Sequence, residues 1–332
     1  MNRARVWNWL VKQRILPILD VLLLVMVTVG TRDFWTIRNL QNLTVAVGIE
    51  GVIAVGMTVV MVGGGIDLSV GSVMALAGVL SVSMQRFGIV GAIAIAVLAA
   101  SLCGAGSGLL VTRLGINPFI ATLGMMLVAR GAVMTYTDAQ PVANANLLFT
   151  QIARGKLGLL PIPGLVFLAA LLLGHWFLRY TRLGRDIYAL GGNEEAARAS
   201  GIRTDRVKLA AYTLTGLSAG VAGVLLASRL STGSPVIGED TALNVITAVL
   251  LGGTSLTGGV GSMPGTLTGL LTVGVLSNSL NLFNVPAYYQ RIAKGMLLIL
   301  VVFFDSLYVR YRRQALLRTR GKASEERLTS TS

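Results

Sequence analysis

The sequence predicts an all-α protein, a polytopic membrane helix bundle of about ten transmembrane helices with a weak internal repeat. The first observation is composition, because 54% of the 332 residues are hydrophobic and only 13% are charged. The second is spacing, since apolar stretches recur along nearly the whole chain and a membrane-spanning helix needs about 20 mostly apolar residues. The third is the presence of 40 glycines, which suit closely packed membrane helices. Together they place nearly the whole chain in lipid.

Hydropathy divides the chain into candidate spans with polar connections between them. The third and eighth spans are the weakest, because glycine and serine interrupt them. The remaining polar chain forms an N-terminal segment, 1–14, and a basic tail, 309–332, which we expect to be disordered. The transmembrane region therefore covers 15–308. In order, the spans are 15–30, 43–62, 66–83, 88–111, 118–136, 163–178, 209–228, 242–256, 265–279 and 292–308.

The basic residues indicate the orientation. With the N-terminus inside the cell, most of the 28 lysines and arginines fall in the N-terminal segment, the inner loops and the C-terminal tail. Membrane proteins show this bias on their cytoplasmic side. Both termini are therefore predicted to be cytoplasmic, and the net charge of +14 reflects topology and contact with membrane lipid. We expect no nucleic-acid partner.

Several functions are excluded by what the chain lacks. It contains no G-x-x-x-x-G-K-[ST] motif, so no P-loop can hold nucleotide phosphates. Its single cysteine, Cys103, lies in an apolar run and can form neither an intramolecular disulfide nor a cysteine metal site. The longest outer connection, 137–162, is too short to be a ligand-binding domain. We predict no catalytic residue, metal or cofactor, and any ATP-driven work must come from a partner.

Two glycine-rich strings form the internal repeat. They are VVMVGGGIDLSVGS at 59–72 and AVLLGGTSLTGGVGS at 248–262. Glycine lets the backbone leave the helical conformation, and non-helical backbone at membrane depth survives only where protein or water satisfies it. Paired interruptions at corresponding positions point to a transport pathway.

Two interpretations of these strings stay open. One is a translocation pathway, in which Asp67 and Ser69 cap a helix and gate the path. The other is a pair of short turns at the inner surface, with Asp67 merely capping the third span. Glu50 is a further candidate, because an ionisable residue in mid-span faces the bundle interior or marks function. The pathway candidates are Glu50, Gly64, Gly65, Asp67, Ser69, Gly252 and Gly253.

The inner loop 179–208 is predicted to contain a short docking helix. Asn193 is a suitable N-cap, Glu194 and Arg198 are spaced i,i+4, and Gly201 supplies a stop. A helix lying on the bilayer is the alternative, but this one is alanine-rich and lacks a large apolar face. Docking onto another protein is therefore favoured. The coupling candidates are Asn193, Glu194, Glu195, Ala196, Arg198 and Gly201.

Four strings, taken in order, resemble one known family. They are GGIDLSVGS, NPFIATLGMM, YALGGNEEAARASGI and VLLGGTSLTGGVGS, and the likeness covers almost the whole chain. They are similar to the permease subunit of bacterial ABC importers for ribose, xylose, arabinose and related sugars. The resemblance implies that two permeases form a channel in the cell inner membrane, a periplasmic binding protein delivers the sugar, and ATP-binding subunits power the cycle. It also implies that 193–202 is the coupling helix.

Other functions remain open at this point. A permease of the same superfamily could carry a nucleoside, an amino acid or a furanosyl signalling molecule. An ion-coupled secondary carrier would use intramembrane carboxylates such as Glu50 and Asp67, but it leaves the docking helix unexplained. A membrane scaffold without transport would leave the glycine-rich repeat unexplained.

Overall fold

The computed structural model describes residues 28, 30–31, 33–144 and 146–307, and it confirms the predicted all-α bundle. Among these residues, five helices are long and apolar enough to cross a membrane. The segments 1–14 and 309–332 lie outside the described residues, and so does nearly all of the predicted span 15–30.

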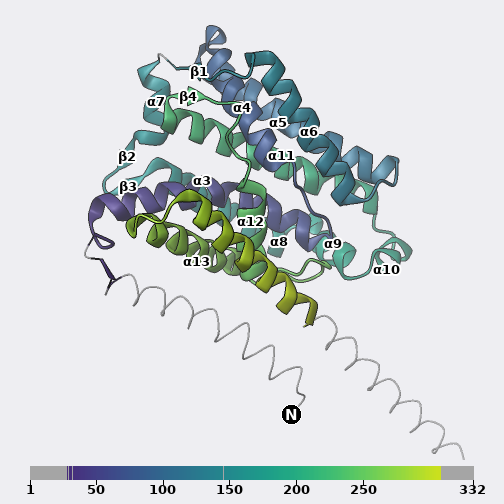
Figure 1. The fold of residues 1–332 in the computed structure, drawn as a ribbon. Coiled ribbons are helices and arrows are strands. Elements are labelled where there is room, and N and C mark those ends of the chain that lie inside the picture. The colour runs from purple at the N-terminus through teal and green to yellow at the C-terminus, as the bar shows by residue number, and fades with distance from the viewer. Residues whose placement is uncertain (1–27, 29, 32, 145, 308–332) are drawn as a thin grey trace, which may run out of the picture.

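The elements follow the predicted order closely (Figure 1). The five long apolar helices are α3 (Ile37–Val62), α5 (Gly88–Arg113) with the short turn Gln85–Phe87 before it, α6 (Pro118–Thr137), α8 (Ile162–Tyr180) and α11 (Thr204–Leu230). The other helices are α4 (Val70–Ser83), α7 (Leu147–Arg154), α9 (Arg182–Gly192), α10 (Glu194–Ala199), α12 (Thr241–Leu251), α13 (Met263–Leu282) and a last described helix at residues 287–307.

The helices form two groups (Figure 1). Helices α4, α5, α6 and α11 lie together, while α3, α8, α13 and the last described helix lie together, with α12 between the groups. Helix α3 packs against both groups. Of its most apolar 18-residue stretch, 83% is buried, compared with 22% of the corresponding stretches of α5, α6 and α8. The core therefore centres on α3, and the outer helices offer their apolar faces to lipid.

Glycine allows helices α5 and α11 to pack closely together. A Cβ atom on Gly104 of α5 would lie 2.3 Å from the carbonyl oxygen of Tyr212, and one on Gly216 of α11 would lie 2.4 Å from that of Ala100. Small residues at such contacts let membrane helices pack backbone to backbone.

The two ends of the bundle differ (Figure 1). At one end, strand β1 (Val142–Ala143) pairs antiparallel with β4 (Thr232–Gly233), beside α7 and the hairpin of β2 (Lys156–Leu157) and β3 (Leu160–Pro161). At the opposite end lie α9 and α10. We call these the α7 end and the α10 end.

The two weakest predicted spans are shorter than expected. Helix α4 begins only at Val70, and α12 ends at Leu251 rather than at residue 256. The 11 residues of α12 span about 16 Å, roughly half of the hydrocarbon core. The chain leaves the helix after α3 and α12 because Gly64 and Gly253 have φ of 81° and 86°, values that favour glycine.

Candidate functional site: the docking loop and the glycine turns

Helix α10 forms as its sequence predicts. The Asn193 side chain accepts a hydrogen bond from the Ala196 backbone N–H at 2.9 Å, and Gly201 follows the helix with φ of 83°. Arg198 Nη2 lies 3.2 Å from Glu194 Oε1, the expected i,i+4 pair. Helix α9, which precedes it, was not predicted, because its charged and polar residues are typical of a loop.

The two glutamates of α10 face different surroundings. Lys208 Nζ of α11 donates to both carboxylate oxygens of Glu194, at 2.7 Å each. Glu195, Ala196 and Ala199 are exposed instead. Glu194 therefore points toward α11, whereas Glu195 does not share this contact.

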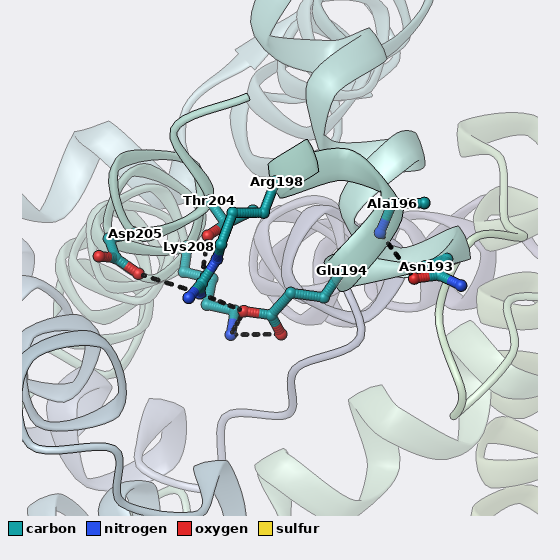
Figure 2. Close-up of polar contacts among 7 residues, drawn as sticks. All are labelled: Asn193, Glu194, Ala196, Arg198, Thr204, Asp205 and Lys208. Atoms are coloured by element: carbon teal, nitrogen blue, oxygen red, sulfur yellow. Dashed lines mark hydrogen bonds and ion pairs between the residues drawn. The ribbon is translucent and has the colours of Figure 1, made fainter. Parts of the chain in front are cut away.

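A second contact joins α10 to α11. Arg198 Nη2 also donates to Thr204 Oγ1 at 3.2 Å and lies 3.9 Å from Asp205 Oδ1 (Figure 2). Exposed ion pairs contribute only about 0–1 kcal/mol each, so the network fixes the position of α10 more than it stabilises the fold. A cavity of about 560 Å³ lies beside it, lined in part by Gly64, Asn117 and Lys208.

The loop 181–203, which we call the docking loop, touches both glycine-rich strings through bare backbone. We call residues 63–69 the first glycine turn and residues 252–262 the second. A Cβ atom on Gly191 would lie 1.9 Å from the Val62 carbonyl oxygen, and one on Gly258 would lie 2.7 Å from Gly64 Cα. Three segments far apart in the sequence therefore meet where no side chain fits.

Hydrogen bonds hold this junction. The Gly259 N–H donates to the Val62 carbonyl at 2.8 Å, and Tyr188 Oη of α9 donates to the Gly261 carbonyl at 2.8 Å. Burial raises the pKa of the Tyr188 phenol, so it stays a donor at neutral pH. Sequence reasoning missed Tyr188 and Gly191, because only the fold brings them to the glycine turns.

The first glycine turn is stabilised from within. Asp67 is fully buried, and its Oδ1 accepts from the Ser69 backbone N–H at 2.8 Å and from Ser69 Oγ at 2.6 Å. Ser69 occupies the N-cap position of α4 without a side-chain capping bond. Asp67 and Ser69 therefore bond to each other just before α4, and the Ser69 side chain does not cap the helix. Within the described ranges, Asp67 Oδ2 has no hydrogen-bond partner.

The second glycine turn packs against α13 and the last described helix. A Cβ atom on Gly252 would lie 2.1 Å from the Gly265 carbonyl oxygen, so a larger residue would not fit at position 252. Asp305 Oδ2 of the last described helix accepts from the Leu256 backbone N–H at 3.3 Å. The first contact fixes the end of α12, and the second holds the turn that follows it.

Glu50 lies apart from both turns, at the centre of α3. Asn244 Nδ2 of α12 donates to Glu50 Oε1 at 3.3 Å. The predicted pathway residues thus lie in three places, with Gly64 and Gly65 in the first glycine turn, Gly252 and Gly253 in the second, and Glu50 beside Asn244. Groups of three or more metal-ligating side chains are absent from the described part of the chain.

Comparison with known proteins decides the family. Residues 39–302 match the family model described as "Branched-chain amino acid transport system / permease component". The chain belongs to this permease family. Membership and the five long apolar helices make the permease a multi-pass inner-membrane protein.

Individual relatives cover nearly the full length of the permease. The ribose import permease protein RbsC of Escherichia coli K12 is 43% identical over 310 residues, covering 90% of this chain and 94% of the relative. That of Bacillus subtilis 168 is 41% identical over 300 residues, covering 89% and 93%. The L-arabinose ABC transporter permease protein AraH of Azospirillum brasilense is 36% identical over 316 residues, covering 95% and 93%. No solved structure matches the permease.

Proposed function

We propose that the chain is the permease subunit of an ATP-driven importer for a monosaccharide, a ribose-like pentose or a related sugar. The observation that carries this is the 43% identity to a ribose import permease over 90% of the chain. The chain itself makes and breaks no covalent bond in this account, and ATP is hydrolysed on a separate subunit.

The proposal requires three protein partners. They are a cytoplasmic ATP-binding subunit, a periplasmic sugar-binding protein and a second permease subunit, either identical or a paralogue. The α10 end then faces the cytoplasm, as the basic loop 179–208 favours, and both termini are cytoplasmic. The exposed Glu195, Ala196 and Ala199 form a small, low surface that a groove on the ATP-binding subunit can grip.

Motion of the docking loop reaches the bundle by two routes in this proposal. Glu194 and Lys208 pass it to α11, and Gly191 passes it to both glycine turns. The bare backbone contact at Gly191 supports the second route, because closely packed groups cannot move independently. ATP-driven closure of the paired ATP-binding subunits would pull the docking loops together and open the permeases outward.

The glycine turns act as hinges on the translocation pathway in this account. Gly64, Gly65, Gly252 and Gly253 supply the bends, and Asp67 with Ser69 holds the first hinge in shape. Glu50 lies in mid-membrane, where an ionisable group marks a functional site by default. An ion-coupled carrier would also use such a carboxylate, but it gives α10 no role.

A second solute class has one observation in its favour, since the matching family model is described by branched-chain amino acid transport. The test is uptake into proteoliposomes that contain the permease, its ATP-binding subunit and its binding protein. Labelled ribose or arabinose should accumulate with ATP, while labelled leucine should not. Accumulation of leucine alone would replace the sugar proposal with the amino-acid one.

A further inference from the structure

A non-helical segment runs into the membrane-embedded part of the bundle between β4 and α12. Gly233 lies beside Val79 of α4, where an added Cβ would be 2.7 Å from Val79 Cα. Gly238 lies beside Gly71, where an added Cβ would be 2.5 Å from the Gly71 carbonyl oxygen. Val79 and Gly71 are eight residues apart on one helix, so the segment descends about 12 Å along α4.

Arg130 of α6 holds this descending segment. Its Nη1 donates to the carbonyl oxygens of Pro235 and Ile237, the latter at 3.0 Å. Carbonyl groups outside regular structure must find donors at membrane depth, because lipid offers none. Arg130 therefore has a structural reason to lie inside a membrane helix.

Charged side chains gather at the deep tip of the segment. Arg291 Nε of the last described helix donates to Asp240 Oδ2 at 2.8 Å, and Arg291 Nη2 lies 3.9 Å from Glu239 Oε2. All three side chains are exposed, by 64% for Arg291, 48% for Asp240 and 62% for Glu239. One turn deeper, Lys294 interacts electrostatically with Glu50, which Asn244 also contacts.

The depth of these charges follows from α3. Glu50 is the 14th of its 26 residues, so it marks the middle of the membrane. Asn244 contacts Glu50 and lies four residues after Asp240, so the ion pair of Asp240 with Arg291 is about 6 Å from that level. Charged groups facing lipid at this depth are energetically costly. Exposed charges there must therefore face water or protein.

We propose that this charged face, formed by Glu239, Asp240, Arg291 and Lys294, lines the outer half of a water-filled sugar pathway whose opposite wall is the second permease subunit. The inference rests on the proposed function. Carboxylate and guanidinium groups supply the acceptors and donors that neighbouring sugar hydroxyls need. The charged face is one wall of the pathway, and the second permease subunit, identical or a paralogue, completes it.

Helix α12 gives the charged face a connection to the docking loop. It begins immediately after Asp240 and ends at the second glycine turn, which Tyr188 of the docking loop contacts. Eleven residues thus join the charged tip to the part of the molecule that the ATP-binding subunit is proposed to move.

The test measures water access by cysteine labelling in the complete transport complex. Asp240→Cys and Leu172→Cys are each made in a Cys103→Ala background and treated from outside with a charged, membrane-impermeant thiol reagent. Leu172 of α8 is a matched control, because it is 60% exposed but lies in an apolar helix. We expect rapid labelling at position 240 and none at position 172. Equal labelling of both, or of neither, would overturn the proposal.

Transport supplies the second readout. Asp240→Asn together with Arg291→Gln should raise the KM for sugar about tenfold, as for the loss of one charge-assisted hydrogen bond. Lys156→Gln, at the α7 end, should leave the KM unchanged. An unchanged KM in the double variant would contradict the inference while leaving the proposed function intact. Absence of ATP-driven sugar uptake in the unsubstituted complex would instead count against the proposed function.

Discussion

At the residue scale, neighbouring side chains of α10 have separate tasks. Glu194 is bound by Lys208, whereas Glu195 is exposed. The sequence predicts the N-cap and the i,i+4 pair because both depend on residues a few positions apart. It does not predict the bond from Glu194 to Lys208, or the one from Asn244 to Glu50, because those depend on how helices pack.

The bond between Glu194 and Lys208 gives the first prediction. Glu194→Gln should lose most ATP-driven uptake because α10 is no longer tied to α11, while stability changes by less than about 1 kcal/mol. Exchanging the charges, with Glu194→Lys and Lys208→Glu together, should restore uptake. Wild-type uptake by Glu194→Gln would show that this link is not needed.

Gly191 gives the second prediction, and the chain supplies its control. Gly191→Ala places a Cβ atom 1.9 Å from the Val62 carbonyl oxygen, and relief of that overlap should cost about 1–3 kcal/mol. Gly192→Ala is the matched variant, because its Cβ meets nothing within 4 Å. Thermal unfolding and sugar uptake of the purified complex should both fall for Gly191→Ala alone. Equal behaviour of the two variants would remove Gly191 from the coupling route.

At the element scale, hydropathy locates the helices well, since α3, α5, α6, α8 and α11 lie where long apolar runs predict them. It fails at α12, which ends at Leu251 although the predicted span runs to Leu256. The reason is packing, because Gly252 must fit against Gly265 of α13. The descending segment before α12 also has no hydropathy signal, since its depth depends on contacts with α4 and Arg130.

Helix α10 gives the third prediction. Glu195→Lys with Ala199→Trp should abolish co-purification of the ATP-binding subunit, because both changes alter the exposed surface proposed to dock. The unfolding temperature of the permease itself should not change. Leu157→Lys, at the exposed β2–β3 hairpin of the opposite end, is the control and should co-purify normally. Retained co-purification of the double variant would move the docking surface elsewhere.

The descending segment gives the fourth prediction. Arg130→Gln removes the guanidinium that satisfies the Pro235 and Ile237 carbonyls, and the loss of these charge-assisted bonds should destabilise the permease by about 2 kcal/mol. Chemical denaturation of the purified protein measures this change. Arg113→Gln, at the exposed end of α5, serves as the control. Equal stability of the two variants would mean that Arg130 does not hold the segment.

At the scale of the whole molecule, the permease is organised as two helix groups around α3, with the docking loop at one end. The glycine turns lie beside that loop, and α12 runs from the second turn to the charged residues near mid-membrane. The chain contains no P-loop motif, and the proposed function places ATP hydrolysis on a separate subunit. In the proposed function the permease is a gate whose motion is imposed by another subunit.

The most direct test of that role compares two sets of proteoliposomes loaded with ATP and supplied with the binding protein and labelled sugar outside. One set contains the permease alone, and the other contains the permease with its ATP-binding subunit. Sugar should accumulate only in the second set, and an ionophore should not abolish it. Accumulation against a gradient by the permease alone, and its collapse with the ionophore, would contradict the account.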